Sequence, residues 1–344
     1  MSPLIEVTGW TLIHFVWQGT LLALATAAAL GACRRSSADV RYAIACLGLT
    51  AMLATAAATA VRGTLPGNAA FLAGDRLATA SRLGAPIEAS IGAAGPQASA
   101  ASQAVRRAAR SSQMLSIVVW IWLGGVASLI ARLAAGCWRI HRLRAATLTA
   151  PLSAWQVTAE RLARRLRVGV PFRIVESAVV DTPILIGWLQ PLIILPLAAM
   201  AHMTAAQVEA LLAHELAHIR RRDYAINLLQ TVAEALLFFH PAVWWISGRI
   251  RQEREHCCDD AAIAVAGEAT AYAEALMALA SWRQREFQPS LGAAKGPLVL
   301  RIRRLLSLAD EHQPSARGGL MLLGTGVSLA AVVLVLAAVS SATA

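Results

Sequence analysis

Charged residues are scarce in this sequence. Asp, Glu, Lys and Arg together make up 15% of its 344 residues, whereas hydrophobic residues make up 57%. A soluble globular domain has about 25% charged residues. The composition therefore excludes a fully cytosolic protein and predicts a membrane protein.

Cysteine and lysine are scarce too. The five cysteines are an odd number without the spacing of a disulfide framework, which excludes a disulfide-stabilised scaffold. Lys295 is the only lysine, so the formal net charge of +11 rests on arginine. The sequence has no compact basic stripe and no nucleic-acid reader motif. We therefore expect no direct nucleic-acid partner and assign the surplus charge to contact with anionic membrane lipids.

Four long stretches contain no Asp, Glu, Lys or Arg, and each can supply the roughly 20 apolar residues that cross a bilayer. The predicted fold is mainly α and integral to the membrane, with four transmembrane helices. The predicted segments are two transmembrane helices within 1–62 (about 7–33 and 42–61), a flexible outer loop over 63–113, a third transmembrane helix over 114–137, a cytoplasmic domain over 138–317, and a fourth transmembrane helix with a short tail over 318–344.

The arginines near the span ends predict the orientation. If the amino terminus is outside, eleven of these arginines lie inside and five outside. Loops on the cytoplasmic side of a membrane carry the excess of Lys and Arg. We therefore expect a multi-pass protein of the inner (cytoplasmic) membrane whose large domain faces the cytoplasm.

The most informative motif is H-E-x-x-H, formed by His214-Glu215-Leu216-Ala217-His218. Two histidines four residues apart on a helix point to the same side and can bind one metal ion. Glu215, between them, can take a proton from a water molecule at that ion, as a metallopeptidase requires. The helix itself is indicated by Thr204 and Gln207, which fit a capping box.

A catalytic zinc site needs a third protein ligand. Arg221 and Tyr224 stand where a metzincin would have Gly and His, so that class is excluded. A carboxylate from a following helix is the alternative, and Glu255 and Asp259 share one helical face. One of them can bind the metal while the other orients a ligand histidine. The competing candidates nearby are Glu253, His256 and the pair Cys257-Cys258.

Residues 225–247 are apolar enough for a further span, but a crossing there would separate His218 from Glu255 by about 30 Å. Asn227, Gln230 and Glu234 also recur at three- and four-residue steps, as a polar edge that lipid does not favour. We therefore predict a buried or membrane-surface helix here. Farther upstream, the runs 184–186 and 192–195 predict strands that form either a sheet edge beside the site, to which an extended substrate can add as a strand, or a hairpin of the core.

Several of these segments resemble the BlaR/MecR-type membrane metallopeptidases. The resemblance covers about residues 172–280 and rests on six segments: TPILIGW at 182–188, PLIILP at 191–196, HELAHIRRRD at 214–223, NLL at 227–229, FHPAVWW at 239–245 and RQEREHCCD at 251–259.

The resemblance implies a cytoplasmic α+β zinc endopeptidase domain of the gluzincin class. It implies Zn²⁺ held by His214, His218 and Glu255, with Glu215 as the catalytic base and Asp259 orienting a ligand. It also implies a role in signalling, in which the peptidase cuts a cytoplasmic protein such as a winged-helix repressor, often after cutting itself. Arg301-Ile302-Arg303-Arg304 is a candidate for the self-cleavage site.

The sequence departs from that family in one respect. Sensor members carry a penicillin-binding domain after the last span, whereas only residues 340–344 follow the last apolar run here, and no S-x-x-K or K-T-G set is present. We therefore do not expect this chain to sense beta-lactams. The alternatives are a membrane quality-control protease and a non-catalytic receptor or scaffold, and the intact Glu215 argues against the latter.

Overall fold

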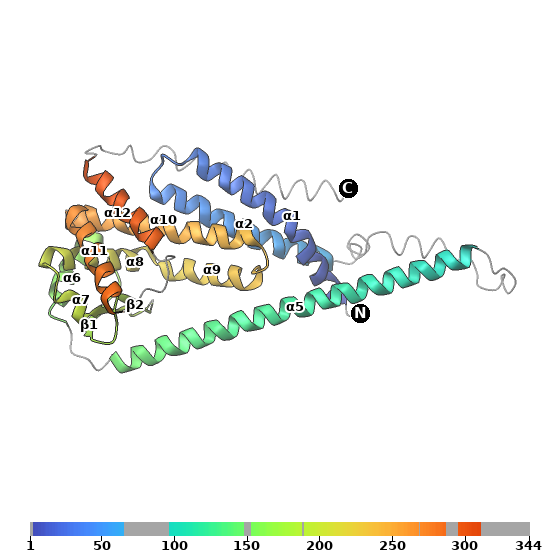
Figure 1. Ribbon diagram of the computed structural model, residues 1–344, viewed down its shortest axis with the longest axis horizontal. Helices are drawn as coiled ribbons and strands as arrows, with labels where there is room; N and C mark the ends of the chain where they lie inside the picture. The colour runs from blue at the N-terminus through green and yellow to red at the C-terminus, as the bar shows by residue number, and fades with distance from the viewer. Residues whose placement is uncertain are drawn as a thin grey trace.

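The computed structural model of this chain describes residues 3–64, 96–147, 153–187, 189–267, 269–286 and 295–310. These residues are mostly helical, with one small sheet (Figure 1). The helices are α1 (Pro3–Ala32), α2 (Ala38–Thr64), α5 (Pro96–Thr147), α6 (Gln156–Leu166), α7 (Leu197–Met200), α8 (Ala205–Arg221), α9 (Asp223–Leu236), α10 (Pro241–Ala266), α11 (Ala269–Glu286) and α12 (Lys295–Asp310).

Within the described residues, three helices are long and apolar enough to cross a membrane. They are α1, α2 and the Gln113–Ala145 part of α5. They coincide with the first three predicted spans, so the expectation of a membrane protein is confirmed. The predicted fourth span at 318–344 lies outside the described residues, as does the 65–95 part of the predicted outer loop.

Helix α5 extends beyond the predicted third span at both ends. Its first residues, 96–113, were expected to belong to the flexible outer loop, but they are helical. Pro96 stands at the first helical position, where its missing N–H costs nothing. No Gly or Pro follows before residue 124, and alanine, the best helix former, is frequent in that stretch. This composition explains why the helix begins so early.

The sheet has the order β1-β3-β2, with β1 (Arg173–Ser177) parallel and β2 (Ile184–Ile186) antiparallel to β3 (Leu192–Pro196). The β2–β3 pair is the predicted hairpin. A core beneath the sheet joins it to α6 and α8, through Leu162, Ile193, Leu212 and Leu216 among others. Because this apolar stripe of α8 packs on the sheet, the opposite side of α8 is left to carry polar side chains.

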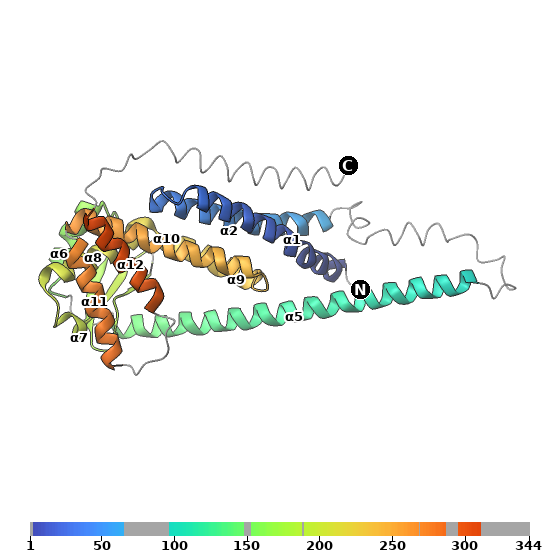
Figure 2. The same ribbon diagram turned by 45° about the horizontal axis from the view of Figure 1, so that its top comes forward.

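The predicted helix over 225–247 is in fact two helices, α9 and α10, which form a hairpin. Helix α9 ends at Leu236, and Pro241 begins α10 because proline cannot continue the preceding helix. The His240 side chain caps α10 by accepting a hydrogen bond from the Ala242 N–H at 3.2 Å. Both views show the two helices running alongside α1 and α2 (Figures 1 and 2).

Ion pairs join the domain, which comprises the sheet and helices α6 to α12, to one end of the candidate spans. Arg41, at the start of α2, contacts the Glu253 carboxylate of α10 through Nε and Nη2, each at 2.9 Å. Asp39 accepts a hydrogen bond from Arg221 at 2.6 Å. These contacts hold the loop between α1 and α2 against the domain, so this loop and the domain lie at the same end of the spans.

The Arg41–Glu253 pair gives a testable pH dependence. Burial raises the pKa of Glu253, but hydrogen bonds from His256 and Arg41 outweigh it and lower the pKa from 4.5 to about 2. A lowered pKa in the folded state stabilises the fold above pH 4.5, and this stabilisation is lost as the pH falls toward 2. We expect Glu253→Gln to cost about 3 kcal/mol at neutral pH. Unfolding measured at several pH values should show this deficit shrinking only in acid, and a deficit that stays constant down to the acid limit would contradict the assignment.

A pair of neighbouring glycines tests how closely α5 meets the hairpin. A Cβ at Gly125 would overlap the Phe238 ring, whereas a Cβ at Gly124 would meet nothing within 4 Å. We expect Gly125→Ala to destabilise the protein by about 1–3 kcal/mol. The control Gly124→Ala should leave stability unchanged or raise it, because alanine favours the helix. Thermal unfolding in detergent measures both, and equal melting temperatures would show that Phe238 does not pack on α5.

Candidate metal centre

Helix α8 positions the H-E-x-x-H motif. Its first turn has the predicted capping box: Thr204 Oγ1 accepts a hydrogen bond from Gln207 N, and Gln207 Oε1 accepts one from Thr204 N. The helix ends at Arg221, Arg222 caps it with a left-handed φ of 55°, and α9 follows at once. Because the apolar stripe of α8 faces the sheet, His214 and His218 face α10.

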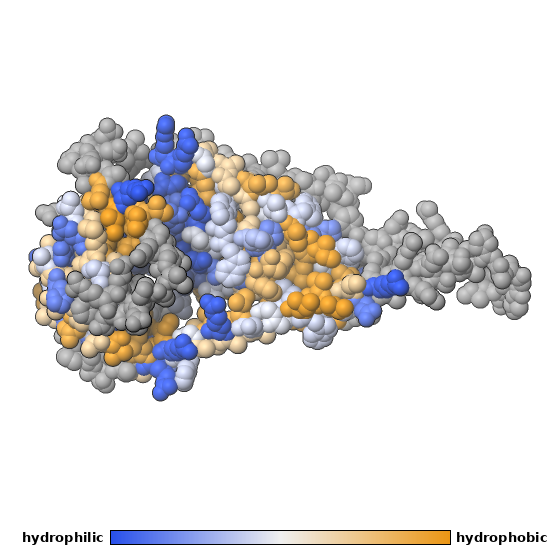
Figure 3. Space-filling model, viewed as in Figure 1, coloured by the Kyte–Doolittle hydropathy of each residue, from blue (hydrophilic) through white to orange (hydrophobic). Residues whose placement is uncertain are grey.

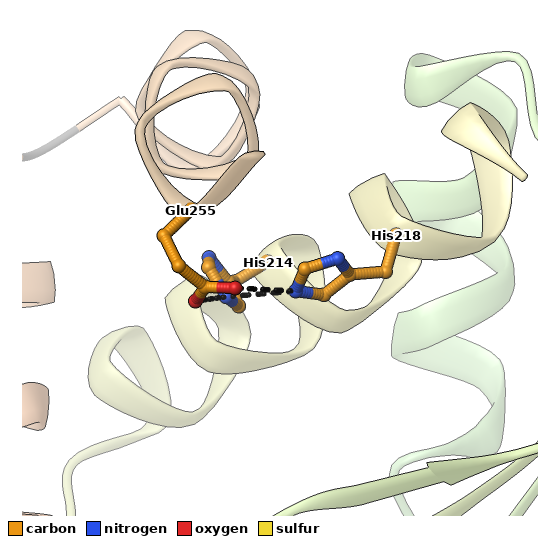
Figure 4. Close-up of side chains that lie close together, drawn as sticks. All are labelled: His214, His218 and Glu255. Carbon is orange, nitrogen blue, oxygen red and sulfur yellow. Dashed lines mark hydrogen bonds and ion pairs between the residues drawn. The ribbon is translucent and has the colours of Figure 1, made fainter. Parts of the chain in front are cut away.

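Three side chains converge between α8 and α10 (Figure 4). The Nε2 atoms of His214 and His218 lie 3.2 Å apart. Glu255, from α10, places its carboxylate oxygens 3.6 Å from His214 Nε2 and 3.9 Å from His218 Nε2. One ligand atom from each residue lies within 4.8 Å of the others, as a metal site requires. These are the three residues that the sequence resemblance assigns as ligands.

The hydrogen bonds behind the two rings show that this group suits a cation. Each histidine turns its Nδ1 toward a buried acceptor, Asp259 for His214 and Asp223 for His218. A carboxylate only accepts hydrogen bonds, so Nδ1 carries a proton in each ring, and each neutral ring presents a lone pair at Nε2. Such lone pairs, 3.2 Å apart beside a carboxylate, repel one another unless a proton or a metal ion lies between them. Two nitrogen ligands of a tetrahedral zinc ion would be about 3.3 Å apart.

The surroundings of His214 include one residue more than predicted. Asp259 Oδ1 lies 3.2 Å from His214 Nδ1, in the place expected of an orienting carboxylate. Tyr272, from α11, lies between them: its hydroxyl is 2.8 Å from His214 Nδ1 and donates to Asp259 Oδ1 at 2.7 Å. Tyr272 is fully buried. The tyrosine therefore supports the histidine and is turned away from any substrate.

Asp223 and Cys258 lie behind His218. Asp223 Oδ2 is 2.7 Å from His218 Nδ1, and Cys258 Sγ is 3.3 Å from the same nitrogen. The sequence analysis did not assign Asp223 a role. It lies five residues after His218, and only the left-handed turn at Arg222 brings it back to the ring. A carboxylate a short distance after the motif is the signal that could have found it.

Of the other candidate ligands, Cys258 lies in a second possible group with His218 and Asp223, whereas Glu253, His256 and Cys257 are directed elsewhere. Glu253 contacts Arg41 and His256, on the side of α10 that faces α2. Cys257 is buried, and burial raises the pKa of its thiol far above the usual value. Neither Glu253, His256 nor Cys257 joins the group of three around His214.

The charged groups around Glu255 shift the pKa values of Glu255 and His214. Burial raises its pKa, but the hydrogen bond and charge of His214 and the charges of His218 and Arg301 outweigh this and lower it to about 2. Burial lowers the pKa of His214, but hydrogen bonds to Asp259 and Glu255 outweigh that and raise it to about 9. The carboxylate is thus ionised at neutral pH, and without a metal ion the raised pKa places a proton on His214 Nε2, which a bound cation would replace.

Arg301, from α12, closes one side of the site. Its Nη1 lies 3.2 Å from Glu255 Oε2, its Nη2 lies 2.6 Å from Asp259 Oδ1, and the same Nη2 donates to the Tyr272 hydroxyl at 2.9 Å. The Arg301–Arg304 segment, named above as a self-cleavage candidate, is helical and bonded into the domain, since Arg304 also pairs with Asp260. Sequence reasoning did not foresee that Arg301 contacts the site.

Glu215 lies beside this group with its carboxylate uncommitted. Its side chain is half-buried, and no hydrogen bond or ion pair within the described residues engages it. A carboxylate in this state can accept a proton from a water molecule in the site.

The supporting carboxylates give a prediction about metal affinity. Asp223→Asn and Asp259→Asn each remove a charge that fixes the tautomer of a ligand histidine. Such changes lower metal affinity by about 10–100-fold. Competition against a chelating dye measures the affinity. Asp260→Asn is the matched control, because Asp260 is next to Asp259 but pairs with Arg304. Full affinity in both test variants would show that the two carboxylates do not support the metal.

A comparison with known protein families shows the family of this chain. Residues 17–305 match the family described as BlaR1 peptidase M56. This chain belongs to the M56 peptidase family. Its membership supports an enzyme of metallopeptidase type with a metal cofactor, in a membrane protein.

Curated relatives come from the same M56 group of regulators. The chain is 31% identical over 111 residues to the regulatory protein BlaR1 of Bacillus licheniformis, which is 32% of this chain and 18% of that protein. It is 28% identical over 83 residues to the methicillin resistance mecR1 protein of Staphylococcus aureus strain Mu50, which is 24% of this chain and 14% of that protein. The similarity thus spans less than a fifth of the length of these relatives.

Proposed function

We propose that this M56 protein is a membrane-embedded zinc endopeptidase that cuts a cytoplasmic protein. The observation that carries the proposal is the convergence of His214, His218 and the Glu255 carboxylate. A carboxylate behind each histidine fixes its ring, and Glu215 lies next to the group without a partner of its own among the described residues. A site of purely structural zinc would have four protein ligands, whereas three leave a position open for reactants.

Each residue of the site has its own role in the proposed hydrolysis. His214, His218 and Glu255 would hold the ion. When bound, zinc lowers the pKa of water and polarises a carbonyl oxygen. Glu215 accepts the proton of the attacking water and then passes it to the nitrogen of the leaving amine. Asp259, Tyr272 and Asp223 keep the two imidazole rings in place throughout. The peptide bond is split into a carboxylate and an amine, with one water consumed.

Two features support a cytoplasmic substrate. The domain contacts the loop between α1 and α2, and that loop and its flanks contain Arg34, Arg35 and Arg41. Loops with such arginines face the cytoplasm. The M56 relatives are described as a regulatory protein and a methicillin resistance protein, so a transcriptional repressor is the substrate that we propose, with self-cleavage as a preceding step.

The proposal is tested with purified protein in lipid nanodiscs. Cytoplasmic extract is incubated with the enzyme, with enzyme plus chelator, and with chelated enzyme resupplied with zinc, and new protein amino termini are identified by mass spectrometry. We expect a small set of new termini that disappears with the chelator and returns with zinc. Many unrelated termini would favour a quality-control protease. No zinc-dependent terminus in extract or in the protein itself would favour a receptor or scaffold.

A further inference from the structure

Polar side chains toward the tip of the α9–α10 hairpin lie between its two helices. Gln230 of α9 is almost fully buried and donates hydrogen bonds to the carbonyl and hydroxyl oxygens of Ser247 on α10, at 2.9 and 2.7 Å. Glu234 accepts hydrogen bonds from the Ser247 hydroxyl and from Arg251, whose Nη1 is 2.6 Å away. Two of the three residues of the polar edge, Gln230 and Glu234, therefore lie between the two helices, whereas Asn227, near the start of α9, is exposed.

The outer face of the hairpin is apolar. Leu228, Val232 and Leu236 follow one another at four-residue steps along α9 and are 53%, 43% and 37% exposed. Trp244 and Trp245, at the start of α10, are 41% and 42% exposed. A helix pair in water shows the reverse pattern, with the apolar stripe inside. In Figure 3, hydrophobic side chains gather beside the tip of the hairpin, where Figure 1 places α1 and α5.

The tip of the hairpin contacts the middle of the candidate spans. His240 Nε2 lies 3.0 Å from the Val16 carbonyl oxygen, and Val16 is the fourteenth of the 30 residues of α1. The Phe238 ring packs against Gly125, the thirteenth of the 33 residues in the Gln113–Ala145 span. The tip thus lies at the depth of the bilayer interior.

Two backbone carbonyls in the turn at the tip accept hydrogen bonds from side chains, as a lipid environment requires. Lipid offers no hydrogen bonds, so polar backbone groups must be satisfied within the protein. The indole N–H of Trp122, on α5, donates to the Leu236 carbonyl at 2.8 Å, and that of Trp244 donates to the Phe238 carbonyl at 2.8 Å. Both carbonyls lie at the end of α9, where a helix leaves such groups unpaired.

We propose that α9 and α10 form a re-entrant hairpin, which enters the hydrocarbon of the bilayer and returns on the side from which it came. The partner of its outer face is lipid acyl chain, because that face continues the surface of the three candidate spans. The hairpin also removes the objection to a membrane segment at 225–247: both ends lie on one side, so His218 and Glu255 still meet.

The hairpin sets the height of the metal site. Fourteen residues of α10 separate Pro241 from Glu255, a rise of about 21 Å. Half of the hydrocarbon thickness is about 15 Å. With its tip near the middle, the hairpin places Glu255 about 6 Å outside the hydrocarbon, at the level of the lipid headgroups. If the proposed function holds, the site acts on peptide segments close to the membrane surface.

Accessibility of a nitroxide label tests the hairpin without using activity. The label is attached through a ketone-bearing unnatural residue at position 228, 232 or 236 of the full chain in nanodiscs, so the native cysteines stay. Oxygen dissolves in lipid and a polar nickel chelate does not. We expect the oxygen-to-nickel collision ratio to rise from 228 to 236 and to exceed several-fold the ratio at position 179, since Val179 is 82% exposed and outside the hairpin.

Two results would overturn the proposal. A ratio at 232 equal to that at 179, or flat from 228 to 236, would place the hairpin in water or on the membrane surface. Low collision with both reagents would mean that protein, such as a second copy of this chain, covers the face. A matched pair of unlabelled variants tests the proposal even if a labelled variant misfolds. Val232→Arg should lower the melting temperature in nanodiscs, whereas Val179→Arg should not.

Discussion

Glu215→Gln is expected to reduce peptide hydrolysis by about 10²–10⁴-fold while zinc stays bound. Glutamine keeps the size of the side chain but cannot take a proton from water. Zinc stays because the ligand group consists of His214, His218 and Glu255, and Glu215 lies outside it. The rate is measured on a substrate found by its new amino terminus, and zinc by elemental analysis of the same preparation.

A glutamate on the same helix provides the control for Glu215. Glu209 pairs with Arg161 at 2.7 Å on the surface, away from the ligand group. Glu209→Gln should keep both the activity and the zinc. An unchanged rate in Glu215→Gln would refute its role as base and leave a protein that binds metal without using this residue for catalysis.

His214→Ala and Glu255→Ala are each expected to lower the zinc content from about one ion per chain to near zero. Removing either leaves two ligands, and the loss should exceed the 10–100-fold weakening expected for the supporting carboxylates. Elemental analysis after dialysis against a weak chelator at neutral pH measures the content.

The control for metal binding is the competing glutamate. In its folded fraction Glu253→Gln should keep its zinc, because Glu253 faces Arg41 and not the histidines. Zinc lost with Glu253→Gln but kept with Glu255→Ala would reverse the assignment of the third ligand. Zinc absent from carefully handled wild type would remove the basis of the enzyme proposal.

Local patterns in the sequence determined several features by themselves. Charge-free runs of sufficient length indicated α1, α2 and the span within α5, because the cost of burying charge in lipid needs no tertiary contact to act. The capping box at Thr204 and the four-residue spacing of His214 and His218 likewise depend only on helix geometry. The sequence analysis did not predict the start of α5, because the prediction of the span rested on apolar content and not on helix propensity.

Only the tertiary structure decided which side chains meet. Glu253 and Glu255 are two residues apart and so point about 200° apart around α10, and the packing of α10 between α2 and α8 selects Glu255 for the site. Asp223 reaches His218 through a left-handed turn, and Arg301 comes from a helix more than forty residues beyond Glu255. Gln230 and Glu234 argued against contact with lipid in the sequence, whereas the structure turns both of them toward α10. In each case the deciding contact joins residues distant in sequence, and no local period encodes which partner a helix face will find.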